Sequence, residues 1–217
     1  MKKPDLGYIW WKLSGAKARS QKLAKDQFNA ILEKLGPEDI AIDLGANIGE
    51  FTKKMAATGA QIFAFEPDPH AADLLRGKLD KMDNVRILEA AAGTKEETAT
   101  LYRRNRFDSE PDRATKSSSL FADKSNMDTS SGFEVQVMDF CKFLTDLDRD
   151  IVIIKMDIEG AEVALMEKLL DDPIANRIGA IFVETHERKL SELARRTAAL
   201  KAITVGQEKP FVNWDWH

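Results

Sequence analysis

Between residue 39 and residue 183, short apolar runs rich in β-branched residues alternate with segments that have the 3.6-residue period of helices. This alternation is typical of βαβ units, in which helices connect parallel strands and cover both faces of their sheet. We therefore predict an α/β fold with a mainly parallel central sheet. The expected strands are residues 40–44, 61–66, 85–91, 151–156 and 178–183, with shorter strands at 98–102 and 134–137, and the expected helices are residues 50–57, 69–82, 139–147, 161–170 and 187–202.

The two ends of the chain and one insertion depart from this alternation. Residues 1–36 are predicted to form an N-terminal helical extension, and residues 37–217 a single domain. Residues 203–206 and 210–214 are expected to form an antiparallel pair that closes the sheet. Residues 103–132 are polar and almost free of aliphatic side chains. Such a segment is either a lid-like insertion over a site or a tolerated insertion, and both interpretations stay open.

Composition limits the kinds of partner that the chain is expected to have. The 32 Lys and Arg residues against 36 Asp and Glu give a formal net charge of -4, which disfavours nucleic acid and anionic membranes as partners. A single cysteine, Cys141, excludes an internal disulfide and a cysteine-rich metal site. No apolar run has the roughly 20 residues that a membrane span needs. We therefore expect a cytoplasmic protein with no membrane span and no nucleic-acid partner, and leave its oligomeric state open.

A glycine-containing turn follows the first expected strand, at the place where open α/β sheets bind ligands. Its glycines let the backbone turn tightly and approach a ligand closely. The dinucleotide fingerprint G-x-G-x-x-G does not occur there, and the carboxylate of Asp43 disfavours a pyrophosphate but favours a cationic ligand. We therefore expect S-adenosyl-L-methionine rather than NAD as the cofactor. The predicted contacts in this turn are Asp43, Gly45, Ala46, Asn47 and Gly49.

An acidic residue at the end of the second strand fits the same interpretation. Glu66 lies about 20 residues after Asp43, the spacing of a carboxylate that accepts hydrogen bonds from ribose hydroxyls. The third strand ends in small residues, which leave room for a flat adenine but are equally typical of close packing. The further predicted cofactor contacts are Glu66, Pro67, Glu89, Ala90, Ala91 and Asp157.

Three segments resemble the FkbM family of methyltransferases. They are residues 42–49, residues 65–67, and residues 154–162. The third segment resembles the family's Lys-x-Asp-x-Glu-Gly-x-Glu box; Ser118-Ser119-Leu120 and Glu184-x-His186 also look similar. The resemblance covers residues 39–186. It implies a Rossmann-like class I methyltransferase fold, S-adenosyl-L-methionine as cofactor, and methylation of a hydroxyl group on a small molecule or carbohydrate.

Three other functions remain to be weighed against this one. A nicotinamide dehydrogenase is disfavoured by the missing glycine fingerprint. A nucleic-acid methyltransferase is favoured by the cluster Arg103, Arg104, Arg106 and Arg113, but the sequence after the strand at 151–156 does not resemble the box of base-modifying enzymes. A non-catalytic binding module would keep the same fold without the reaction.

The catalytic candidates lie at the ends of the last two major strands. Transfer of a methyl group to a hydroxyl requires a base, and the near-neutral pKa of a histidine suits this role. His186 is therefore either the base or a loop histidine that is bonded to the backbone. Asp157 is expected to position the cofactor or acceptor, and Glu159 to be either an acceptor-side polar group or a stabilising carboxylate before the next helix. Glu162 is interpreted as a helix-surface or capping residue, and Lys155 as an ion-pair partner of Asp157 or Glu159. A divalent ion held by Asp157, Glu184 and His186 is conceivable, but no metal site is predicted.

Overall fold

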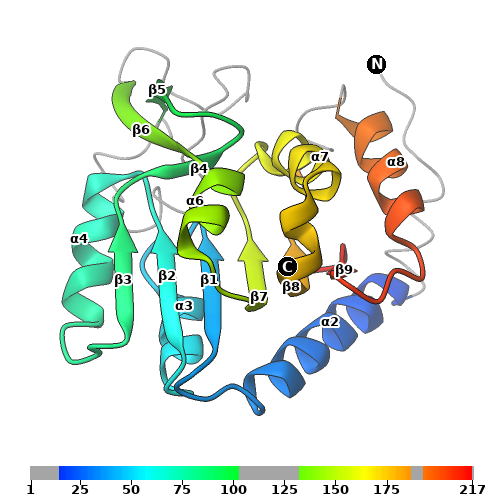
Figure 1. The fold of residues 1–217 in the computed structure, drawn as a ribbon, viewed down its shortest axis with the longest axis horizontal. Helices are drawn as coiled ribbons and strands as arrows, with labels where there is room; N and C mark the ends of the chain where they lie inside the picture. The colour runs from blue at the N-terminus through cyan, green and yellow to red at the C-terminus, as the bar shows by residue number, and fades with distance from the viewer. Residues whose placement is uncertain (1–14, 103–131, 187–192, 217) are drawn as a thin grey trace.

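The computed structural model describes residues 15–102, 132–186 and 193–216 (Figure 1). The predictions for residues 103–131, for the start of the helix at 187–202 and for the arginine cluster lie outside these residues. The main sheet has six strands in the order β3-β2-β1-β7-β8-β9, and every pairing in it is parallel. These strands are β1 (Ile40–Leu44), β2 (Gln61–Phe65), β3 (Val85–Leu88), β7 (Ile151–Met156), β8 (Ile178–Val183) and β9 (Phe211–Asn213). The predicted α/β fold with a mainly parallel central sheet is confirmed.

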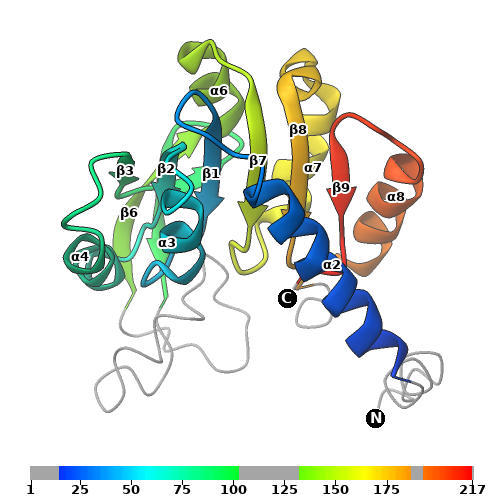
Figure 2. The same ribbon diagram turned by 90° about the horizontal axis from the view of Figure 1, so that it is seen from below.

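Helices cover both faces of this sheet (Figures 1 and 2). One apolar core joins β1, β2 and β7 to α6, α7 and α8, and a second joins the opposite face to α2 and α3. The connections follow the expected order, with a short 3₁₀ turn after α7. The helical segments are α2 (Ala16–Leu32), α3 (Glu50–Ala56), α4 (Pro69–Lys78), α6 (Phe140–Leu147), α7 (Glu162–Asp171), η2 (Pro173–Arg177) and α8 (Ala194–Thr204).

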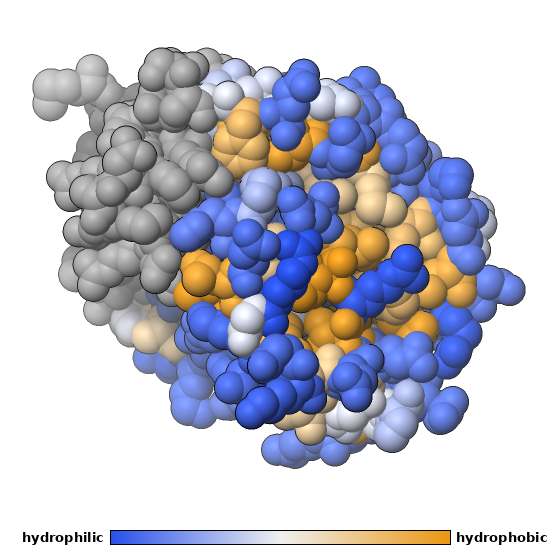
Figure 3. Space-filling view, turned by 90° about the vertical axis from the view of Figure 1, so that its left-hand side faces the viewer, coloured by the Kyte–Doolittle hydropathy of each residue, from blue (hydrophilic) through white to orange (hydrophobic). Residues whose placement is uncertain are grey.

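A second, smaller sheet contains β4 (Ala91–Gly93), β5 (Glu97–Leu101) and β6 (Phe133–Asp139) in the order β4-β6-β5. The expected third strand, 85–91, is therefore two strands in two sheets, because the chain leaves β3 after Leu88 and pairs with β6 from Ala91. β3 forms the edge of the main sheet, and on that side apolar surface lies between polar side chains (Figure 3).

The predicted antiparallel closing pair is wrong. Residues 203 and 204 belong to α8, and β9 pairs in parallel with β8. The chain returns through α8 before it enters β9, and a helical crossover of this kind connects parallel strands rather than a hairpin. The antiparallel pair that the structure does contain joins β5 to β6 in the smaller sheet.

The helix α2 lies within the predicted N-terminal extension and is anchored to the sheet by aromatic contacts. The ring of Phe28 lies 4.5 Å from Trp216 and 5.2 Å from Phe182, measured between ring centroids. All three side chains are almost fully buried. The C-terminal Trp216 thus closes the same core that α2 covers, while the domain boundary at residue 36 stays a prediction. None of the helices in the described ranges is long and apolar enough to cross a membrane.

Candidate active site

The turn after β1 is held tightly against the ends of its neighbouring strands. The backbone N–H groups of Gly45 and Ala46 both donate to the carbonyl oxygen of Phe65. Gly45 has a φ of 76°, and a Cβ placed on it would lie 1.9 Å from the carbonyl oxygen of Asp157. Only glycine therefore fits at position 45, because any side chain there would push the turn away from the residue that follows β7.

Behind the turn, a buried lysine joins β1 to β7. Lys155 is the register partner of Asp43 on the adjacent strand. Its ammonium Nζ lies 3.2 Å from Asp43 Oδ1 and 4.0 Å from Asp157 Oδ2, and it donates a hydrogen bond of 2.8 Å to the carbonyl oxygen of Gly45. Burial alone would lower the pKa of Lys155, but the charges of Asp43 and Asp157 outweigh it and raise this pKa. The lysine therefore remains charged. Its expected pairing with Asp157 or Glu159 is present only as the longer contact with Asp157, because its nearest carboxylate is that of Asp43.

The environment of Asp43 changes the electrostatic basis of the expected cofactor preference. Its side chain is fully buried, accepts a hydrogen bond of 2.7 Å from Thr52 Oγ1, and pairs with Lys155. A carboxylate whose charge is balanced in this way neither repels a pyrophosphate nor attracts a cation strongly. Asp157, with 29% of its side chain exposed, is the more accessible carboxylate at this edge.

Glu66 closes the turn from the side of β2. Its carboxylate accepts hydrogen bonds from the backbone N–H of Asn47 at 2.7 Å and of Asp68 at 2.8 Å. Burial raises the pKa of Glu66 from 4.5 to about 7, although both backbone donors act in the opposite direction. Asn47 has a φ of 49°, so the turn places its N–H toward Glu66 in a left-handed conformation that asparagine tolerates.

The remaining predicted cofactor residues surround this turn with different exposures. Ala46, Ala90 and Ala91 are buried, and Gly49 forms the left-handed N-cap of α3. Glu89 differs from them, because it is exposed and forms an ion pair with Arg76 of α4. Pro67 lies between Glu66 and the N-cap residue of α4.

After β7, the chain turns sharply before α7 begins. Glu159 has a φ of 54° and Gly160 a φ of 120°, and residues other than glycine rarely adopt such positive values. This turn brings the backbone N–H groups of Ile158 and Gly160 onto the carboxylate of Glu162, at 3.2 Å and 2.9 Å. Glu162 is the first residue of α7, but its donors lie in the turn before the helix, so it does not cap the helix as expected. It does not lie on the helix surface either, since only 1% of it is exposed.

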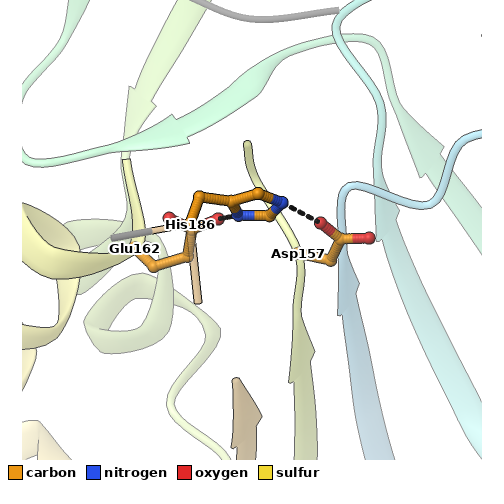
Figure 4. A group of neighbouring side chains, drawn as sticks. All are labelled: Asp157, Glu162 and His186. Carbon is orange, nitrogen blue, oxygen red and sulfur yellow. Dashed lines mark hydrogen bonds and ion pairs between the residues drawn. The ribbon is translucent and has the colours of Figure 1, made fainter. Parts of the chain in front are cut away.

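Glu162 also contacts His186, which follows β8 (Figure 4). The distance from His186 Nδ1 to Glu162 Oε1 is 2.8 Å, while His186 Nε2 lies 3.4 Å from Glu159 Oε2 and 3.8 Å from Asp157 Oδ1. The structure thus brings the three predicted catalytic residues, Asp157, Glu159 and His186, into one cluster. Asp157 Oδ1 is buried and has no hydrogen-bond donor among the described residues.

The same cluster is the one that could hold a metal ion among the described residues. Ligand atoms of Asp157, Glu162 and His186 lie within 4.8 Å of one another. However, the histidine nitrogen that faces Glu162 is not the one that faces Asp157. One ion could not use both carboxylates together with the imidazole unless His186 gave up its hydrogen bond to Glu162. Glu184, the third ligand conceived from the sequence, is not part of this group, although its charge raises the pKa of Asp157 further after burial has raised it.

The sequence does not predict a place in the site for Glu162 or Thr52. The spacing of Glu162 in the sequence indicates the start of a helix, but it does not indicate a contact with the histidine that follows β8. Thr52 lies in α3, and nothing in its local pattern indicates a hydrogen bond to Asp43. The resemblance to the FkbM family could have indicated a role for Glu162, because this residue is the last one in the family's box at residues 155–162.

A parallel sheet in the order β3-β2-β1-β7-β8-β9, with helices on both faces and polar groups at the carboxyl ends of the strands, defines a Rossmann-like α/β domain. The FkbM methyltransferase domain matches residues 43–204, about three quarters of the chain. The chain belongs to this family, as its motifs suggest.

Comparisons with individual proteins are more local. The chain is 36% identical over 67 residues to 2-O-methyltransferase NoeI of Sinorhizobium fredii, covering 30% of this chain and 27% of that protein. It is 42% identical over 53 residues to ribosomal RNA small subunit methyltransferase A of Thermotoga petrophila, covering 24% and 20%. The match to each of these relatives therefore spans well under a third of the relative's length. Among solved structures, an rRNA methylase from Streptococcus thermophilus aligns over 81% of this chain and 74% of its own, with 12% identity and a TM-score of 0.42.

The raised pKa of Glu66 predicts a specific pH dependence of stability. Between pH 4.5 and about 7, the folded protein retains a proton on Glu66 that the unfolded chain releases. The contribution of this proton to the free energy of unfolding is therefore complete below pH 4.5 and is lost as pH rises through about 7. Glu66→Gln carries no charge at any pH. Its free energy of unfolding relative to wild type should therefore rise by up to about 3 kcal/mol from about pH 5 to about pH 8.5. Urea unfolding at both pH values measures this, with the exposed Glu97→Gln as control, and an unchanged difference would contradict it.

Proposed function

We propose that this chain is an S-adenosyl-L-methionine-dependent methyltransferase that methylates a hydroxyl group on a small molecule or carbohydrate. The observation that carries this proposal is the arrangement of His186. Its Nδ1 is held by the buried Glu162, and its Nε2 is turned toward Asp157 and Glu159 at the carboxyl edge of the sheet. A histidine placed in this way can accept the proton that a hydroxyl group loses as it becomes a nucleophile.

The residues around the turn fit the proposed cofactor. Glu66 is a carboxylate at the end of β2, where it can accept hydrogen bonds from ribose hydroxyls, and Asp157 Oδ1 is a buried oxygen that lacks a donor among the described residues. When bound, S-adenosyl-L-methionine supplies a methyl group on a sulfonium. Asp157 would hold the cationic end of the cofactor, and Asp43 would support the turn through Lys155 rather than contact the ligand. The other proposed contacts are Gly45, Ala46, Asn47, Gly49, Pro67, Glu89, Ala90 and Ala91.

Mechanism follows from the arrangement of the chain's own polar groups. The acceptor hydroxyl would donate its proton to His186 Nε2, and Glu162 would stabilise the imidazolium that forms. Glu159 Oε2, at 3.4 Å from the same nitrogen, is placed to orient the acceptor or to stabilise the same positive charge. In-line transfer of the methyl group then depends mainly on the alignment of the acceptor oxygen with that group, and the rigid strand ends contribute to this alignment.

The charge of the site favours an acceptor that is not a polyanion. The described groups at this edge include the carboxyls of Glu66, Asp157, Glu159, Glu162 and Glu184, against the cations Lys155 and, when protonated, His186. Repulsion by these carboxylates disfavours a phosphate backbone close to the reacting group. An RNA acceptor is the second candidate, because short segments are similar to ribosomal RNA methyltransferases. A non-catalytic binding module would have no need for a histidine held in this way.

The cofactor assignment predicts that S-adenosylhomocysteine binds to wild type and that NAD does not. Glu66→Ala should weaken this binding by about 1–3 kcal/mol, because ribose hydroxyls would lose their acceptor. Isothermal titration measures both ligands, with Glu97→Ala, an exposed change on β5, as the matched control. Equal affinity of wild type and Glu66→Ala for S-adenosylhomocysteine, with both proteins folded, would remove Glu66 from the site.

The proposed base predicts a loss of turnover without a loss of cofactor affinity. His186→Ala should lower the single-turnover rate with a hydroxyl acceptor by about 10²–10⁴-fold. Acceptors are found by screening sugars and small hydroxyl compounds, with an RNA oligonucleotide as the competing class. His70→Ala on α4 is the control and should retain the wild-type rate. A rate near wild type in His186→Ala would place the base elsewhere, and methylation of RNA alone would overturn the acceptor class.

A further inference from the structure

We infer that Glu162 is a positioning residue for the reaction, which fixes the tautomer of His186 and thereby directs the lone pair of Nε2 to the acceptor. This inference rests on the proposed function. It gives a task in the chemistry to a side chain that never contacts the substrate.

The first support is the way in which Glu162 itself is held. Its carboxylate is buried and accepts the backbone N–H groups of Ile158 and Gly160. The turn that provides these donors places Glu159 at a φ of 54°, a conformation that is unfavourable for a residue with a side chain. A strained turn whose two N–H groups donate to one carboxylate fixes the orientation of that carboxylate before any ligand binds.

The second support is the identity of the atoms that meet. An ionised carboxylate only accepts hydrogen bonds, so the 2.8 Å contact requires a proton on His186 Nδ1. In the neutral imidazole the lone pair then resides on Nε2, which is the nitrogen that faces Asp157 and Glu159. With the other tautomer, Nε2 would carry a proton and could not act as a base.

The third support is a charge balance that favours the forming imidazolium. Glu162 lies on one side of the ring, and Asp157 and Glu159 lie on the other. Because His186 is buried, water screens these charges weakly, and each carboxylate stabilises a proton gained at Nε2. Glu162 differs from the other two because it approaches the ring at Nδ1, at 2.8 Å, while they face Nε2.

Glu162→Gln tests this inference with little change in shape. The glutamine carbonyl can still accept from the backbone N–H of Gly160, while its amide group, in place of the oxygen that faces Ile158 and His186, can donate to Nδ1 and so favours a proton on Nε2. We expect S-adenosylhomocysteine affinity to stay within about twofold, and the single-turnover rate to fall by at least about 10²-fold. Glu162→Asp, which keeps the charge, should recover part of the rate. The control is Glu167→Gln on the exposed face of α7, where Glu167 pairs with Arg196.

Nitrogen-15 NMR of the histidine rings provides a readout that does not depend on activity. Wild type should show the Nδ1–H tautomer for His186, assigned with His186→Ala, and Glu162→Gln should show the Nε2–H tautomer. A merely structural role for Glu162 predicts lost stability with an unchanged tautomer, and that result would overturn the inference, as would an Nε2–H tautomer in wild type. If no hydroxyl acceptor is methylated by wild type, the proposed function fails, while the tautomer measurement still decides whether Glu162 orients His186.

Discussion

The ion pair between Lys155 and Asp43 is the interaction on which the geometry of the site depends. It links the two central strands at their carboxyl ends, and the same ammonium binds the carbonyl of Gly45 at the start of the turn. Two buried charges are costly to remove from water unless they are well paired, and removal of one partner from such a pair usually costs 3–5 kcal/mol. The pair therefore contributes little net stability but makes other arrangements of these strand ends unfavourable. Gly45, with no side chain, allows the turn and the end of β7 to touch.

From this fixed point, the site divides into two halves with different electrostatics. On the side of β1 and β2, backbone N–H groups hold Glu66 in an environment that raises its pKa. On the side of β7 and β8, a strained turn holds Glu162, which in turn holds His186. Asp157 lies between the halves, since it neighbours Lys155 on one side and His186 on the other. A ligand that spans both halves would contact a carboxylate in each half, and in the half formed by β7 and β8 it would also contact His186.

Much of this arrangement could be predicted from the sequence because its signals are local. Alternating apolar runs specify the parallel strands, and glycine at positions 45 and 49 marks a turn that only a positive φ can form. The direction of β9 could not be predicted in this way, because two short segments near the C-terminus match a hairpin as well as they match a helix followed by a strand. The balance of charge at Asp43 could not be predicted either, because it depends on a lysine more than 100 residues away in the sequence. The role of Glu162 could not be predicted for a similar reason, since its position at the start of a helix is a local feature and its contact with His186 is not.

The most direct test is a crystal structure of the protein with S-adenosylhomocysteine bound. The account predicts that the ribose hydroxyls lie about 2.5–3.0 Å from the carboxylate of Glu66, and that the amino-acid end of the ligand lies beside Asp157 with the hydrogen bond between Glu162 and His186 intact. A ligand bound away from the turn of residues 43–49, or a His186 ring rotated out of contact with Glu162 in the complex, would contradict it.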